Sequence, residues 1–212
     1  MGMGTYFLGR VFSIFSMSLV VAAIGAYFSK DINLTNTFVV ILLVIIEFAL
    51  IFAINALKRN PTLSALLLFG FTFISGLIIG PVIYTFFQFG ASGLVFEALG
   101  ITAGIFLFIT AIVYIFHIDL TRSRIGVFLM MALFGIIVVS IVNLFLRNPA
   151  IYFWISSITV VVFSGFVLYD ISRILNNPQI ENEYMAAVQL YLDFYNIFIN
   201  LLNILGIVRT RK

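Results

Sequence analysis

The 212-residue sequence contains no cysteine and few charged side chains. The lack of cysteine excludes disulfide bonds, thiolate nucleophiles and metal sites built on thiolates. Asp, Glu, Lys and Arg make up only 9% of the chain, against about 25% in a soluble domain, whereas 63% of the residues are hydrophobic. A soluble core of this size could not bury so much apolar surface. The sequence therefore predicts an integral membrane protein without a soluble domain.

The charge is also poorly arranged for binding nucleic acid. The formal net charge of +3 is spread over the ends of the apolar stretches and a small C-terminal cluster. A nucleic-acid binder would gather its basic residues on one face. We therefore expect the lipid bilayer, and not nucleic acid, to be the main partner.

Charged residues, Pro and Asn divide the chain into seven apolar intervals, each long enough for the ~20 residues that a helix needs to cross a membrane. No small-residue cleavage pattern follows the first interval, so we expect it to be a span and not a removed signal peptide. The prediction is an all-α protein with residues 1–212 in a single seven-helix transmembrane domain. The expected spans are 7–28, 37–57, 62–88, 94–116, 125–146, 151–172 and 184–207.

Basic loop residues predict the orientation, because Lys and Arg are retained on the cytoplasmic side. With the N-terminus inside, the cytoplasmic side holds Arg10, Lys58, Arg59, Arg122, Arg124 and Arg173, and the outside holds Lys30 and Arg147. Seven spans would put the basic C-terminal tail outside, so either the last segment does not fully cross or the tail is an exception. We predict a multi-pass protein of the cell membrane with a cytoplasmic N-terminus.

Small residues at four-residue spacing permit helices to approach closely. The third span has Gly76 and Gly80, and the fourth has Gly100 and Gly104. Both pairs are expected to serve helix packing. Pro81 follows Gly80 and is expected to kink the third span or to mark where its helix weakens.

Four carboxyl side chains fall inside the predicted spans or at their edges: Glu47, Glu97, Asp170 and Asp193. An ionised acid at the bilayer centre costs ~3 kcal/mol or more, so these residues should face the helix bundle, a partner or water. Glu47 lies in the middle of the second span, where it either lines a path or makes a buried polar contact with a neighbouring helix. Glu97 lies near an outer helix start, where the helix dipole can stabilise it or it can form an outer cation site.

The last span has a polar stripe on an otherwise apolar helix. At ~100° per residue, its members fall within an arc of ~80°. The stripe consists of Gln189, Asp193, Asn196, Asn200 and Asn203. It predicts either a helix beside a hydrated path or a seam of hydrogen bonds between helices. For Asp193 the functional interpretation is favoured, because a carboxylate holds helices together less well than an amide does.

Asp170 lies near the cytoplasmic end of the sixth span, and a short loop returns the chain into the seventh. Helices joined in this way normally pack antiparallel, so Asp170 and Asp193 are expected to meet. Two like charges cannot both ionise cheaply, so the pair would share one proton and respond to pH. When ionised, the two carboxylates would form a hard oxygen site that suits Ca²⁺.

The sequence resembles the transmembrane Bax-inhibitor-motif family, and its bacterial members in particular. The most specific matches are Leu168-Tyr169-Asp170 and the run from Leu190 to Leu202. Further matches are Phe73-Ile74-Ser75-Gly76 with Pro81, Glu97-Ala98-Leu99-Gly100, and Glu47. Together these matches extend over most of the chain.

The resemblance implies a bundle whose last helix is enclosed by two layers of three helices. It also implies a passive, pH-sensitive leak of Ca²⁺, with Asp170 and Asp193 as the gate and no cofactor. A basic latch at the inner end of the second helix would hold the pair, and Lys58 or Arg59 occupies the matching position. A Lys lacks the bidentate fork of an Arg, which weakens the match at Lys58.

Other classes of membrane protein share some of these sequence features. Gly90-Ala91-Ser92-Gly93 has the form of the GxSG motif of rhomboid proteases, but the only histidine, His117, is 25 residues further on, or ~37 Å along a helix. No Ser–His dyad can form, and we expect no enzymatic activity. A proton-coupled cation exchanger remains an alternative, because exchangers also use paired intramembrane acids. A purely structural scaffold would pass no ions.

Overall fold

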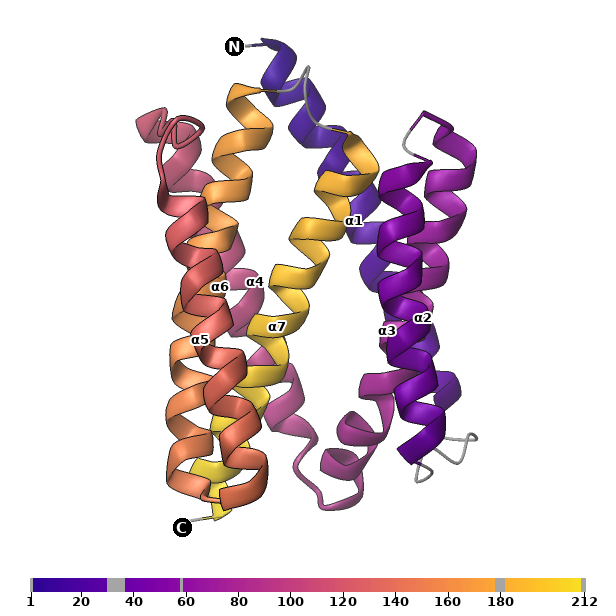
Figure 1. Ribbon diagram of the computed structural model, residues 1–212, viewed down its shortest axis with the longest axis vertical. Coiled ribbons are helices and arrows are strands. Elements are labelled where there is room, and N and C mark those ends of the chain that lie inside the picture. The colour runs from indigo at the N-terminus through magenta and orange to yellow at the C-terminus, as the bar shows by residue number, and fades with distance from the viewer. Residues whose placement is uncertain (1, 30–36, 58, 178–181, 211–212) are drawn as a thin grey trace. The chain divides into compact units, whose positions relative to one another are not determined.

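The computed structural model describes residues 2–29, 37–57, 59–177 and 182–210. Across these residues the chain is helical, without strands, and seven helices are long and apolar enough to cross a membrane (Figure 1). The predicted class and the number of spans are confirmed. The helices are α1 (Gly2–Phe28), α2 (Thr37–Ala56), α3 (Pro61–Gln88), α4 (Ser92–Phe116), α5 (Ile125–Leu146), α6 (Pro149–Asn176) and α7 (Glu183–Thr210).

Asn and Pro set two of the helix starts. Asn60 accepts a hydrogen bond from the backbone N–H of Leu63, and Pro61 occupies the first turn of α3. Asn148 accepts from the N–H groups of Ala150 and Ile151 ahead of α6. Such caps satisfy donors that the helix itself leaves free, and Pro at the first position loses nothing by lacking an N–H.

Several helices extend beyond the predicted spans, and the first begins at Gly2 instead of residue 7. The sixth continues to Asn176, and the seventh has 28 residues. At 1.5 Å per residue the seventh helix is ~42 Å long, which is enough to cross a ~30 Å hydrocarbon layer. The last segment is therefore long enough to cross, and the side on which the C-terminal tail lies stays a prediction.

The helices form two compact units. The first consists of Met1–Ser92 with Gln179–Tyr191, and the second of Gly93–Pro178 with Leu192–Lys212. Each unit therefore contains three of the first six helices and a part of α7. The single domain expected from the sequence stays a prediction, as does the enclosure of the last helix by two layers.

In the first unit, α3 packs against both α1 and α2. A Cβ added at Gly76 would collide with the backbone of Ala22 in α1, and one at Gly80 would collide with Ala26 and Ser29. Gly25 of α1 meets the backbone of Phe73 in the same way. The predicted close approach at Gly76 and Gly80 is confirmed, and it requires residues without side chains on both helices.

The expectation for the fourth span was wrong. A Cβ at Gly100 or Gly104 would meet no atom within 4 Å. The four-residue spacing is the same as in α3, but a spacing shows only that two small residues share a helix face, not that a partner covers this face.

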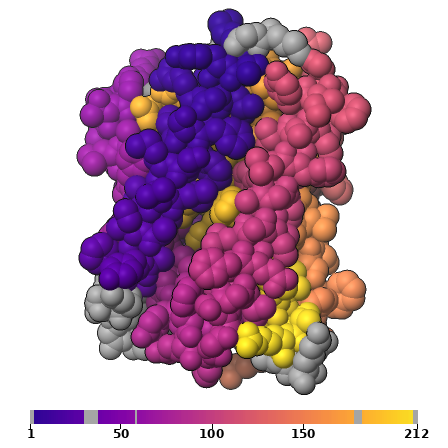
Figure 2. Space-filling view, turned by 180° about the vertical axis from the view of Figure 1, so that it is seen from behind, coloured from indigo at the N-terminus to yellow at the C-terminus, as the bar shows by residue number. Residues whose placement is uncertain are grey.

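In the second unit, α5 packs against α6, and the two helices run side by side in Figure 1. Gly126 makes room for the ring of Tyr169, and Gly165 for Leu129. Most other side chains of α5 are exposed and apolar, and the same is true of long faces of α1 and α4. Outward faces of α1 (indigo) and α4 (magenta) are visible in Figure 2. Apolar faces of this length suit contact with lipid chains.

Candidate functional site: a buried pair of carboxyl groups

Asp170 and Asp193 meet in the second unit, as expected from the sequence. Asp170 lies in α6 and is 6% exposed, and Asp193 lies in α7 and is 4% exposed. The two side chains interact through their charges and through a hydrogen bond between the carboxyl groups. A hydrogen bond between two carboxyl groups requires a proton on one of them. That the pair shares one proton stays a prediction.

One carboxyl oxygen of the pair makes no hydrogen bond. Oδ2 of Asp193 is buried and has no hydrogen-bond partner among the described residues. A buried, unpaired carboxylate oxygen costs free energy, so it is a natural acceptor for a proton or a cation. Three or more acidic or histidine side chains do not cluster anywhere in the described residues. A cation at the pair would therefore be bound by these two carboxyl groups and by oxygens of other kinds.

The end of α6 beyond Asp170 is fixed to the loop between α4 and α5. The hydroxyl of Ser172 accepts from the N–H of Leu120 at 2.8 Å and donates to the carbonyl of Ile118 at 3.0 Å. Asn176 Nδ2 donates to the same carbonyl at 3.1 Å. Ser172 is fully buried. We call Ser172 and Asn176 the loop clamp; no local sequence pattern marks these two residues.

The amides of the polar stripe on α7 bond mainly to their own helix. Asn196 Nδ2 donates to the carbonyl of Leu192, and Asn200 Nδ2 to that of Asn196. Asn203 shares a hydrogen bond with Tyr152 of α6, which is the kind of link between helices that the seam interpretation predicts. Gln189, like the three Asn residues, is half-buried.

Glu47 of α2 lies next to α3 in the first unit. Its side chain is half-buried and shares a hydrogen bond with Ser75 of α3, which is itself 3% exposed. The carboxyl group therefore has a partner within the first unit. A role in lining a path stays a prediction.

Two other expected site residues lie at the surface. Glu97 is exposed, and it lies in the second turn of α4, whose first turn contains no acidic residue. Because the helix dipole acts within about the first turn, its stabilising effect on Glu97 is weaker than expected. Arg59 is exposed between α2 and α3. Lys58 lies outside the described residues, so the choice between these two as latch stays open.

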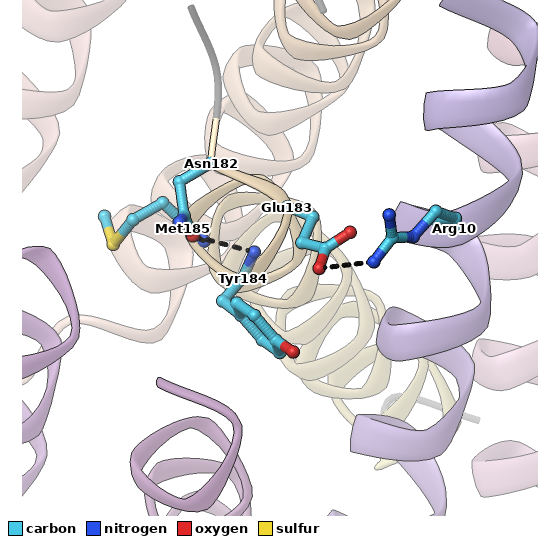
Figure 3. Close-up of polar contacts among 5 residues, drawn as sticks. All are labelled: Arg10, Asn182, Glu183, Tyr184 and Met185. Atoms are coloured by element: carbon cyan, nitrogen blue, oxygen red, sulfur yellow. Dashed lines mark hydrogen bonds and ion pairs between the residues drawn. The ribbon is translucent and has the colours of Figure 1, made fainter. Parts of the chain in front are cut away.

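The start of α7 is held to α1 by an ion pair within the first unit. Arg10 Nη2 lies 2.8 Å from Oε1 of Glu183 (Figure 3). Next to it, Oδ1 of Asn182 accepts from the backbone N–H groups of Tyr184 and Met185. A capping Asn followed by an acidic residue in the first turn is a strong helix start.

A multi-pass protein whose helices hold two buried, interacting carboxyl groups belongs to the class of membrane proteins with intramembrane acids. Comparison with known proteins defines this class further. The family described as Inhibitor of apoptosis-promoting Bax1 matches residues 5–210, and the chain belongs to this Bax-inhibitor family.

Three relatives illustrate the range of the family. An uncharacterized protein of Borreliella burgdorferi is 33% identical over 94% of this chain and 91% of its own. The Escherichia coli protein named Modulator of FtsH protease YccA is 32% identical over 95% of this chain and 87% of its own. Bax inhibitor 1 of Schizosaccharomyces pombe is 31% identical over 96% of this chain and 77% of its own. The resemblance noted in the sequence is confirmed.

Proposed function

We propose that this protein is a passive, pH-sensitive leak for Ca²⁺, gated by Asp170 and Asp193. The observation that carries the proposal is the burial of two interacting carboxyl groups, at 6% and 4% exposure, on two membrane helices. Apolar side chains in the same two positions would stabilise a membrane protein at least as well as a buried pair of acids does. A functional reason for the acids is therefore favoured.

In the proposed mechanism the proton count of the pair sets the state of the gate. With one proton shared, the two carboxyl groups attract each other and hold α6 against α7. With both ionised, they repel and favour opening, and the carboxylate oxygens become ligands for a hard divalent cation. A basic latch at Lys58 or Arg59 would oppose opening by pairing with the charged acids. Glu47, Gln189 and the Asn residues of α7 would line the path, with Glu97 near its outer mouth.

The alternative is a proton-coupled exchanger that uses the same acids. The test is Ca²⁺ entry into vesicles that contain the purified protein and a trapped Ca²⁺ indicator. A leak passes Ca²⁺ down its gradient with no counter-ion, and its rate does not saturate at low Ca²⁺. Flux that requires an opposing proton or sodium gradient and saturates would replace the leak with an exchanger, and no flux in either condition would reject both.

We also propose that the protein has no enzymatic activity and no bound cofactor. Ser92 and His117 flank the two ends of α4, so they cannot form a dyad. The membrane is proposed to be the cell membrane, with the N-terminus in the cytoplasm, on the distribution of basic residues. This orientation can be tested with a reporter that is active on only one side of the membrane and is attached to either terminus.

A second candidate role is modulation of an FtsH-type membrane protease. It is supported by the similarity to the Escherichia coli protein whose name states this role. The two roles are separable: co-purification with FtsH and altered turnover of an FtsH substrate would support modulation, and should persist when both aspartates are replaced by Asn. Unchanged turnover of the FtsH substrate together with no co-purification would reject the modulation role and leave the Ca²⁺ leak as the proposed function.

A further inference from the structure

The hairpin of α5 and α6 contains a cavity that the proposed gate does not use. It has a volume of about 640 Å³ and is lined by residues from the end of α5, the connector and the start of α6. The connector, Arg147 and Asn148, separates two membrane spans. The cavity therefore lies where the helices leave the hydrocarbon, at the depth of lipid headgroups.

The polar groups of the cavity leave two kinds of donor unused. Asn143 is 7% exposed, and its Oδ1 accepts from the N–H of Asn148 at 3.1 Å, but its Nδ2 has no acceptor among the described residues. Arg147 has no ion pair within the described part of the chain. Because Asn143 lines the cavity, its free amide N–H can donate to an oxygen of a ligand that enters there.

The remaining polar groups around the cavity already have partners. Ser140 donates to the carbonyl of Ile136, the Asn148 side chain caps α6, and Tyr152 shares a hydrogen bond with Asn203. These bonds hold the walls in place. The start of α6 adds the positive end of a helix dipole, although its first free N–H groups are taken by Asn148.

The charge of the lining residues indicates which charge a ligand of this cavity would carry. It contains one cation, Arg147, and no acidic residue. A guanidinium with an amide donor beside it suits a phosphate group, to which Arg can donate two parallel hydrogen bonds. A zwitterionic headgroup would bring a quaternary amine that finds no carboxylate here.

The apolar part of the lining favours a lipid over a free phosphate ion. Leu144 and Phe145 line the cavity and are 71% and 80% exposed, so they continue it onto the outer, apolar face of α5. A ligand with an anionic head in the cavity and an apolar tail along α5 would cover both. We propose that this cavity binds the phosphate of an anionic phospholipid, with Arg147 and Asn143 as its donors.

The experiment compares lipids retained by the full-length protein. The protein is purified in detergent, mixed with phosphatidylglycerol or phosphatidylcholine of equal chain length, and its bound lipid is counted by native mass spectrometry. We expect retention of phosphatidylglycerol over phosphatidylcholine, and about a tenfold loss of apparent affinity in Arg147→Gln, the size expected when a charged hydrogen bond is lost. Asn143→Ala should weaken binding in the same direction, and Arg147→Lys should retain part of it.

The matched control is Arg124→Gln, which removes an exposed Arg just before the opposite end of α5. It should leave retention unchanged. Equal loss in Arg124→Gln and Arg147→Gln would mean that charge alone attracts the lipid and would overturn the site. Inorganic phosphate forms a separate arm: if phosphate binds at Arg147 while neither lipid is retained, the lipid assignment is wrong.

Discussion

Arg10 in α1 and Glu183 at the start of α7 are 173 positions apart in the sequence and form an ion pair of 2.8 Å. The Arg10 side chain is 54% exposed, and exposed pairs contribute only about 0–1 kcal/mol. We therefore expect Arg10→Gln and Glu183→Gln each to destabilise the protein by less than ~1 kcal/mol. A double-mutant cycle in detergent unfolding measures the coupling, which should shrink as salt is added. A coupling above ~2 kcal/mol that is indifferent to salt would contradict this account.

Gly76 and Gly104 provide a matched test of helix packing. A Cβ at Gly76 meets the backbone of Ala22, which cannot move aside cheaply, whereas a Cβ at Gly104 meets nothing. Gly76→Ala should destabilise the fold by about 1–3 kcal/mol. Gly104→Ala should be neutral or stabilise it by up to about 1 kcal/mol through helix propensity. Unfolding of both variants in mixed detergent measures the difference, and a tolerated Gly76→Ala would show that α1 and α3 are not in close contact there.

The loop clamp can be tested through a backbone amide. In Ser172→Ala the N–H of Leu120 loses its acceptor, while Ile118 keeps the bond from Asn176. We expect faster hydrogen exchange at Leu120 and a loss of about 1–3 kcal/mol in stability. Ser157→Ala is the control, because that hydroxyl bonds only to the carbonyl of Phe153 in its own helix. Unchanged exchange at Leu120 would mean that the clamp does not hold the loop.

Thr121 lowers the pKa of Asp119, which lies in the same loop. The Thr121 hydroxyl and N–H both donate to Asp119 Oδ1, which lowers the pKa of Asp119. Because the folded-state pKa lies below the unfolded value, ionised Asp119 favours the folded state above the unfolded pKa, and this effect is lost as the pH falls through the folded pKa. Thr121→Val removes the stronger bond and should raise the pKa of Asp119 towards its ordinary value. Carboxyl carbon chemical shifts followed across pH measure this change; an unmoved titration would refute it.

The sequence was sufficient to predict the spans because their ends have local signals. Asn60 with Pro61 and Asn148 with Pro149 mark helix starts wherever they occur. The meeting of Asp170 and Asp193 was also predictable, since a short connection makes α6 and α7 neighbours and acids are rare in membrane helices.

Other features depend on side-chain choices that no local pattern reveals. Asn196 and Asn200 were placed on the correct face of α7, but the bonds of their amides to their own helix depend on the rotamer. In the sequence, Ser172 cannot be distinguished from other small residues on an apolar helix. Its hydrogen-bond partners are backbone atoms more than 50 residues away. The difference between Gly76 and Gly104 is likewise decided by the neighbouring helix.

The central claim is that the proton shared by Asp170 and Asp193 gates ion passage. Two charges ~4 Å apart repel by roughly 4 kcal/mol at an effective dielectric constant of ~20, enough to shift a closed state towards an open one by more than about tenfold. Replacing either Asp by Asn leaves at most one charge, so the repulsion cannot develop. Asp119→Asn is the control, because a carboxyl group with a lowered pKa does not titrate near neutral pH.

The most direct measurement is Ca²⁺ entry into vesicles at steps between pH 6 and pH 8. The account predicts that entry through the unmodified protein rises with pH, that Asp170→Asn and Asp193→Asn abolish this rise, and that Asp119→Asn leaves it intact. Entry that does not change with pH, or that keeps its pH dependence in both Asn variants of the pair, would contradict the account.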